Sequence, residues 1–197
     1  MSEMEEQENN NAQSQAKKDE KYDCFIEGLD FAVLGDPAIN QLYHKSYFGY
    51  LDGQKLLLER EEVILLLERG RIRVLDGKRN EKELKEIIKL FTTSDPAFWS
   101  NYLVYKDLRE RGYLVRKAPS QFTTYKVYSR GSSPEETPAR KIVLPMVEGM
   151  SLELEDLDMA VKSAISGKKK LLLGVVDRVG DVTYYEASQL EPSKNFP

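Results

Sequence analysis

The chain is poor in the residues on which several classes of protein depend. Its 197 residues include one cysteine, Cys24, so an internal disulfide framework is excluded. The one histidine, His44, excludes an HExxH zinc site and any two-histidine pair supplied by this chain alone. No apolar run approaches the ~20 residues that a membrane span needs, and no glycine-rich phosphate loop of standard spacing occurs. These absences favour a soluble, cytoplasmic protein that needs no metal and no cofactor.

The charges of the chain are nearly balanced. There are 29 lysines and arginines against 33 acids, a net charge of -4. The first 23 residues hold seven of the acids and three lysines, which leaves 26 charges of each sign from residue 24 onward. We interpret residues 1–23 as a disordered acidic tail, since they show no periodic apolar face. Any affinity for nucleic acid must therefore come from a local patch of the folded body.

Apolar spacing and turn signals divide the rest of the chain into two domains. The break falls at Thr92–Pro96, where polar residues and a proline interrupt the pattern. We expect a small N-terminal α+β domain at residues 24–93 and a mixed-sheet α+β domain at residues 94–197. In the first domain, the spacing predicts helices over 37–46, 59–69 and 81–91 and strands over 47–51 and 72–75.

The second domain begins with a well-marked helix. Ser94 or Asp95 can cap it, Pro96 suits its first turn, and Gly112 ends it. The continuous apolar run Leu171–Val176 is typical of a strand that is covered on both faces. The order that follows the first helix is three strands, a helix and two strands. The strands are predicted over 113–117, 125–128, 142–147, 170–177 and 182–186, and the second helix over 154–166.

Basic residues at strand ends are the first candidates for function. Lys168, Lys169 and Lys170 immediately precede the apolar strand, so an ammonium group stays at the end of the sheet, where it can meet an anion. Lysines also flank hydrophobic strands simply to prevent aggregation, and the sequence leaves both interpretations open. For His44, on a predicted helix and with no second histidine, we expect a structural role.

Most of the chain resembles the archaeal tRNA-splicing endonuclease family. In the second domain, YKDLRxRGY followed by GDxxYY is the most specific part of this resemblance. The stretch YFGYLDGQKLLLEREEVILLLERGRIRV resembles the family's small N-terminal domain. The resemblance implies that the second domain has the mixed-sheet, restriction-endonuclease-like fold of the family. The segments that carry it are Tyr102–Val115, Tyr125–Gly131, Lys168–Asp177 and Gly180–Tyr185.

The resemblance also implies where a catalytic site would lie. Active members of the family cleave precursor tRNA without a metal and leave a 2′,3′-cyclic phosphate and a 5′-hydroxyl. They use a tyrosine as base, a histidine as acid and a lysine to stabilise charge. Tyr128 matches the tyrosine and Lys169 the lysine, or Lys168 or Lys170 if the register is shifted by one residue, but Pro138 occupies the position of the histidine. The stretch Phe122–Tyr125 also lacks the glycine and the acid that usually precede the tyrosine.

A chain that has the family's fold motifs but no catalytic histidine resembles its non-catalytic, structural subunit. Such a subunit assembles with a catalytic subunit, here expected as an α2β2 hetero-oligomer, and reaches precursor tRNA through the complex. The turn with Asp177 and Asp181 resembles the acidic loop that docks into a basic pocket of the opposite subunit. On the last strand, Tyr184 and Tyr185 are expected to point to opposite faces, so one can meet a partner.

Two other functions stay open at this point. In an active nuclease, Glu135 or Glu136 would replace the missing acid, with a pKa raised substantially. A stand-alone RNA-binding protein would instead be a monomer whose RNA affinity falls with salt.

Overall fold

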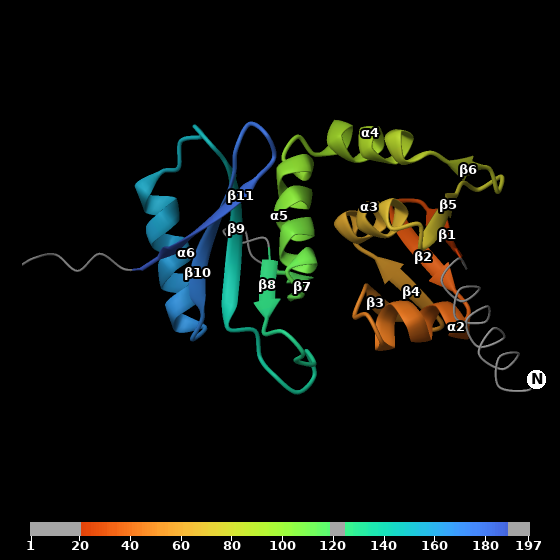
Figure 1. Cartoon of the computed structure of the whole chain (residues 1–197), viewed down its shortest axis with the longest axis horizontal. Coiled ribbons are helices and arrows are strands. Elements are labelled where there is room, and N and C mark those ends of the chain that lie inside the picture. Colours follow the sequence, from red (N-terminus) through yellow and green to blue (C-terminus); the bar gives the residue numbers. More distant parts are fainter. Residues whose placement is uncertain (1–20, 119–124, 189–197) are drawn as a thin grey trace, which may run out of the picture. The chain divides into compact units, whose positions relative to one another are not determined.

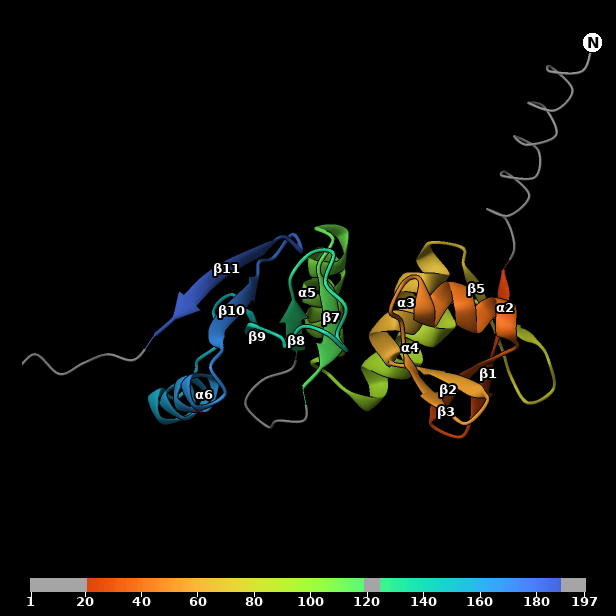
Figure 2. The ribbon, with the colours of Figure 1, turned by 90° about the horizontal axis from the view of Figure 1, so that it is seen from below.

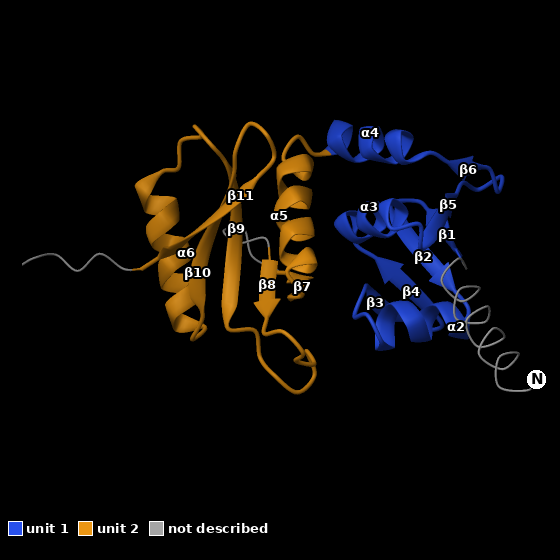
Figure 3. Ribbon diagram, in the orientation of Figure 1, with its two compact units in different colours: residues 1–94 blue, residues 95–197 orange. Residues whose placement is uncertain are grey.

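The computed structural model describes residues 21–118 and 125–188. The chain forms two compact units, residues 1–94 and residues 95–197 (Figure 3). We refer to them as the N-terminal unit and the C-terminal unit. None of the helices in the described ranges is long and apolar enough to cross a membrane.

The N-terminal unit is built on a six-stranded mixed sheet. Its strand order is β3-β4-β2-β1-β5-β6, and only the β1–β5 pair is parallel. The core combines α3 with the strands, and Cys24, Val33 and Ile64 are fully buried in it. The elements are β1 Tyr22–Glu27, β2 Asp30–Leu34, α2 Asp36–Ile39, a π-helical turn Asn40–His44, β3 Tyr50–Asp52, β4 Lys55–Leu58, α3 Arg60–Glu68, β5 Ile72–Leu75, β6 Glu81–Lys82 and α4 Leu84–Ser94.

Carboxylates fix the start of α3. Glu59 and Glu62 form a capping box, in which the Glu62 carboxylate accepts the backbone N–H of Glu59 at 2.9 Å. The same Glu62 oxygen accepts the N–H of Gly49 at 2.9 Å, so it also holds the loop before β3. Gly49 has a φ of 65°, and a Cβ built on it would lie 2.3 Å from the carbonyl oxygen of Leu57. Only glycine fits here.

The sequence predicted this unit incompletely. Strands β1, β2 and β4 were not predicted, and β1 takes Tyr22 and Asp23 from the expected tail; residues 1–20 lie outside the described residues. The helix predicted over 81–91 begins later, because residues 81–82 pair with β5. The Glu86 carboxylate accepts the N–H of Glu83, which favours a helix start at this point.

The C-terminal unit is a five-stranded mixed sheet with a helix on each face (Figure 1). Its strand order is β11-β10-β9-β8-β7, and only β9 and β10 are parallel, joined by α6. Both views place β10 between α5 and α6 (Figure 2). The elements are α5 Phe98–Glu110, β7 Leu114–Lys117, β8 Tyr125–Tyr128, β9 Lys141–Val147, α6 Leu154–Ser166, β10 Lys170–Val176 and β11 Val182–Ala187.

Alternating residues of β10 meet the two helices. Leu171 packs with α6 residues such as Val161, whereas a Cβ on Gly174 would lie 3.1 Å from Val104 of α5. Coverage on both faces agrees with the prediction from the apolar run. The predicted helices and strands of this unit are confirmed in type and order. The first helix starts later than predicted, at Phe98, because Ser94 ends α4 and the Asp95 carboxylate accepts the N–H of Ala97.

Candidate functional site

The sheet of the C-terminal unit gathers at one end the three positions that the family resemblance assigns to catalysis, those of Tyr128, Pro138 and Lys169. Strand β8 runs antiparallel to β9, and β9 runs parallel to β10, so the end of β8 meets the starts of β9 and β10. Val127 pairs with Lys141, and Lys141 pairs with Lys170. Tyr128 directly follows Val127 in the chain, and Lys169 directly precedes Lys170. The segment with Pro138 leads into β9 at the same end.

The three consecutive lysines differ in their contacts. Lys168 has a φ of 54° and forms the turn after α6. The Lys169 ammonium donates to the carbonyl oxygen of Gly167 at 2.9 Å, which satisfies a free carbonyl at the end of α6. Lys170 forms an ion pair with Glu186 of β11 at 2.8 Å. The lysine that the family resemblance singled out thus makes a structural contact.

The connection between β8 and β9 is ordered by its own backbone. The N–H groups of Glu136 and Thr137 both donate to the carbonyl oxygen of Ser133. Pro138, Glu135 and Glu136 are all exposed to solvent, and Tyr128 is half-buried. The proline therefore places a group that carries no proton where the family resemblance expected an acid. The atypical residues before the tyrosine, 122–124, lie outside the described residues.

The acidic turn between β10 and β11 lies at the opposite end of the sheet (Figure 1). One oxygen of the Asp177 carboxylate accepts the N–H groups of Val179 and Asp181, each at 2.9 Å. Asp177 is thus the residue that closes the turn. Asp181 and Arg178 are exposed, and Val179 is 83% exposed at the tip. The side chains available to a partner at this turn are therefore an acid, a cation and an apolar residue.

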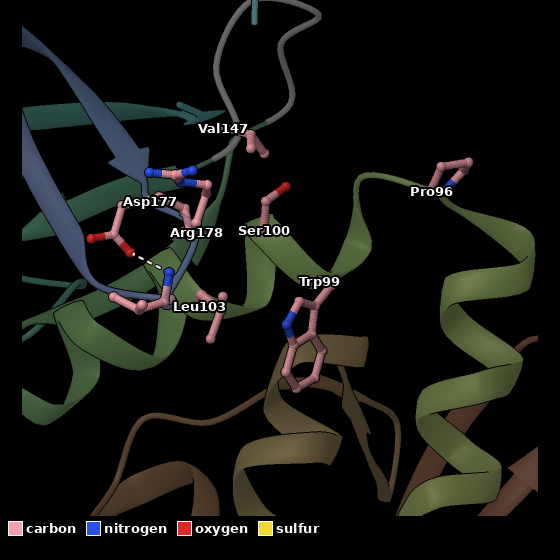
Figure 4. Close-up of a pocket in the computed structure, with 10 residues that line it drawn as sticks. Pro96, Trp99, Ser100, Leu103, Val147, Asp177 and Arg178 are labelled. Carbon is pink, nitrogen blue, oxygen red and sulfur yellow. Dashed lines mark hydrogen bonds between the residues drawn. The ribbon is translucent and has the colours of Figure 1, made fainter. Parts of the chain in front are cut away.

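A depression of about 370 Å³ lies beside this turn (Figure 4). The start of α5 and the ends of β9 and β10 form its walls. The tryptophan in its wall, Trp99, is 40% exposed and lies off the apolar face of its helix, a signal that the sequence analysis did not use. The lining residues are Pro96, Trp99, Ser100, Leu103, Val147, Val176 and residues 177–180.

A partly buried network fastens β11 to α5. The Tyr184 hydroxyl donates to the Asp107 carboxylate at 2.8 Å, and Arg111 Nε donates to the same oxygen at 2.7 Å. The Arg111 guanidinium also lies 5.7 Å from the Tyr184 ring centroid. Burial, together with the hydrogen bond to Asp107, raises the pKa of the Tyr184 phenol well above its ordinary value. Tyr185 points away and is 57% exposed, as predicted from strand alternation.

This network joins segments 102–115 and 180–185, which carry the most specific part of the family resemblance. Comparison with known proteins indicates the same family. Residues 27–85 match the N-terminal domain of tRNA intron endonucleases, and residues 98–184 match the catalytic C-terminal domain. A tRNA-splicing endonuclease of Thermococcus onnurineus is 36% identical over 167 residues, which cover 81% of this chain and 95% of that protein. This chain belongs to the tRNA-splicing endonuclease family. The resemblance in the sequence and the predicted two-part α+β architecture are thereby confirmed.

Other members of the tRNA-splicing endonuclease family differ in length. The protein of Thermococcus kodakarensis is 40% identical over 149 residues, which cover 76% of this chain and 86% of that protein. The protein of Methanosarcina acetivorans is 34% identical over 173 residues, which cover 87% of this chain but 48% of that protein. The aligned part of this chain therefore corresponds to about half of the longer Methanosarcina acetivorans protein.

Removing the shared carboxylate of the network is expected to destabilise the C-terminal unit. Asp107→Ala leaves the half-buried Tyr184 hydroxyl and Arg111 without their acceptor, which costs about 2 kcal/mol of unfolding free energy. Urea unfolding followed by the fluorescence of the sole tryptophan, Trp99, measures this change.

The matched control is Asp158→Ala in α6. Asp158 also forms an i,i+4 ion pair on a helix, but its side chain and that of Lys162 are 44% and 62% exposed. Its loss is expected to cost no more than about 0.5 kcal/mol. Equal shifts for both variants would show that the network adds nothing beyond an ordinary surface ion pair.

Proposed function

We propose that this chain is the non-catalytic, structural subunit of a tRNA-splicing endonuclease. It assembles with catalytic subunits, as an α2β2 heterotetramer, and positions them on precursor tRNA. The observation that carries this proposal is Pro138, which lies at the sheet end of Tyr128 and Lys169 where the acid is needed.

The chemistry explains why this one position matters. In the cleavage, the 2′-hydroxyl loses its proton and its oxygen bonds to phosphorus, while the bond from phosphorus to the 5′-oxygen breaks. The departing 5′-oxygen must then take up a proton. A positioned general acid contributes about 10²–10⁴ to the rate of such a step. Pro138 cannot supply the proton, because its side chain carries no titratable group.

Two exposed features of the C-terminal sheet support assembly, namely its edge strand β11 and the turn between β10 and β11. Strand β11 is an edge strand, and Tyr185 on it is an exposed aromatic residue of the kind that anchors interfaces. The neighbouring turn presents the Asp181 carboxylate to solvent, and a carboxylate gains most when a partner's arginine desolvates it. The proposed docking turn and the vestigial site thus lie at opposite ends of one sheet.

The decisive experiment is cleavage of a precursor tRNA that contains an intron. Three reactions are compared: this chain alone, a histidine-containing catalytic homologue from the same source alone, and their mixture. We expect cleavage in the mixture only, and the Asp181→Ala variant should weaken it by lowering association. Lys162→Ala on the exposed face of α6 is the control.

Two results would overturn the proposal. Cleavage by this chain alone would show that it is itself a nuclease, with Glu135 and Glu136 as the first acids to replace. Failure to associate with the homologue, together with tight RNA binding as a monomer, would favour a stand-alone RNA-binding protein.

A further inference from the structure

Two cations lie over one aromatic ring at the sheet end that carries Tyr128. The Arg130 guanidinium is 5.0 Å from the centroid of the Tyr113 ring, and the Lys141 ammonium is 5.7 Å from the same centroid. Both cations therefore lie at the same ring. We propose that Arg130, Tyr113 and Lys141 form a clamp for the phosphodiester backbone of an RNA strand.

Three separate elements fix the members of this clamp. Tyr113 stands between α5 and β7, and its N–H donates to the carbonyl oxygen of Leu108 at 3.0 Å. Arg130 follows the end of β8 by two residues, and Lys141 is the first residue of β9. The ring is thus anchored by its backbone, and the sheet register brings the two cations to it. Cation–π attraction orients both side chains.

The surrounding charges favour an anion. Within residues 21–118 and 125–188, neither Arg130 nor Lys141 forms an ion pair with a carboxylate. The two segments at this sheet end, 128–141 and 167–170, hold six basic residues against the acids Glu135 and Glu136; of the six, Lys170 is already paired with Glu186 of β11. Two cations that pair with no carboxylate of the described residues both gain from a polyanion that contacts each of them. The six basic residues are Arg130, Arg140, Lys141, Lys168, Lys169 and Lys170.

The geometry suits a phosphate backbone. A guanidinium presents a planar fork of donors that matches two phosphate oxygens, and the ammonium adds a second, compact charge at the same ring. Arg130 is exposed, while Tyr113 and Lys141 are half-buried, so the clamp is open to a long polyanion from outside. The choice of RNA as that polyanion rests on the proposed function, whereas the convergence of the cations on one ring does not.

Binding of the full chain to a fluorescein-labelled, intron-containing precursor tRNA tests the clamp. Fluorescence anisotropy is measured over a range of salt concentrations. The double variant R130A/K141A is expected to raise Kd about tenfold at low salt and to lower the slope of log K against log salt by about 1 to 2. The control K85A/K89A removes the same charge from exposed positions on α4, and we expect it to leave both Kd and the salt slope nearly unchanged.

Substitutions of Tyr113 test whether its ring positions the two cations, separately from the effect of their charges. Tyr113→Leu keeps both cations but removes the ring, and is expected to weaken binding about threefold, whereas Tyr113→Phe keeps the ring and the affinity. Inorganic phosphate, added at constant ionic strength, should displace the RNA only weakly, since it offers one phosphate to a site built for a strand. The urea midpoint, followed by Trp99 fluorescence, checks that each variant is folded.

Each unfavourable outcome has a definite meaning. The clamp is overturned if R130A/K141A behaves like K85A/K89A, or if the unmodified chain binds no precursor tRNA at the lowest salt. It is overturned as an RNA site if inorganic phosphate at low concentration abolishes binding. The proposed structural role is decided separately by the mixing experiment, since cleavage by this chain alone would end that role and leave the clamp intact.

Discussion

Tyr128→Phe in this chain is expected to leave cleavage by the reconstituted enzyme within about twofold, the range of a neutral surface change. Replacing the base tyrosine of the catalytic partner by phenylalanine is expected to lower cleavage by about 10²–10⁴. The same atom is removed in both cases. On the proposed function the results differ because Pro138, which carries no titratable group, stands where the family resemblance places the general acid.

Single-turnover cleavage with excess enzyme separates this chemistry from assembly. A second variant, Lys169→Ala, should also be silent, because on the proposed function this site performs no cleavage whose charge Lys169 could stabilise. Size-exclusion chromatography controls for loss of the complex. If Tyr128→Phe lowered the rate as much as the matching change in the partner, Tyr128 would be a working base and the structural-subunit proposal would fail.

Gly49→Ala is expected to cost about 3 kcal/mol or more of the stability of the N-terminal unit. The new Cβ would lie 2.3 Å from the Leu57 carbonyl oxygen and 2.7 Å from a methyl group of Leu56. Overpacking of this kind costs about 1–3 kcal/mol, and a left-handed backbone costs a residue with a Cβ about 1–2 kcal/mol more. Relief of either strain would break the hydrogen bond from the Gly49 N–H to Glu62.

The control, Gly53→Ala, separates these two causes. Gly53 has a similar φ of 58°, but nothing lies within 4 Å of its Cβ position, so only the backbone cost of about 1–2 kcal/mol remains. Equal losses for both variants would show that crowding at Gly49 contributes nothing.

The chain contains one natural probe for each unit. Cys24 is fully buried in β1, and burial raises its pKa to about 12, so its thiol reacts only after the N-terminal unit opens. Gly49→Ala should raise the rate of thiol labelling about 100-fold, since each 1.4 kcal/mol is a factor of ten in the opening equilibrium. Fluorescence of Trp99 should report an unchanged C-terminal unit.

Local patterns in the sequence were enough to predict most helices and strands of the C-terminal unit. The helix at Leu154–Ser166 and the strand at Tyr125–Tyr128 begin and end where spacing predicted them. Their signals are strong because one side of each element is buried over several consecutive repeats. The N-terminal unit was predicted less well. Of the six residues of β1 only Cys24 is fully buried, so this strand shows no regular alternation of apolar and polar residues that a local pattern could reveal.

The sequence by itself determined which residues are present at the candidate site, and above all that Pro138 stands where the family resemblance places the acid. It also carried the family motifs, because side-chain chemistry and spacing are local properties of the chain. Only the tertiary structure decided how those residues are used. The sheet register gathers Tyr128, Pro138 and Lys169 at one end and the acidic turn at the other, and brings Arg130 and Lys141 to Tyr113. Asp177, expected at an interface, supplies the hydrogen bonds that close its own turn. These outcomes depend on strand pairing between distant segments, and no local periodicity encodes which ends of the strands meet.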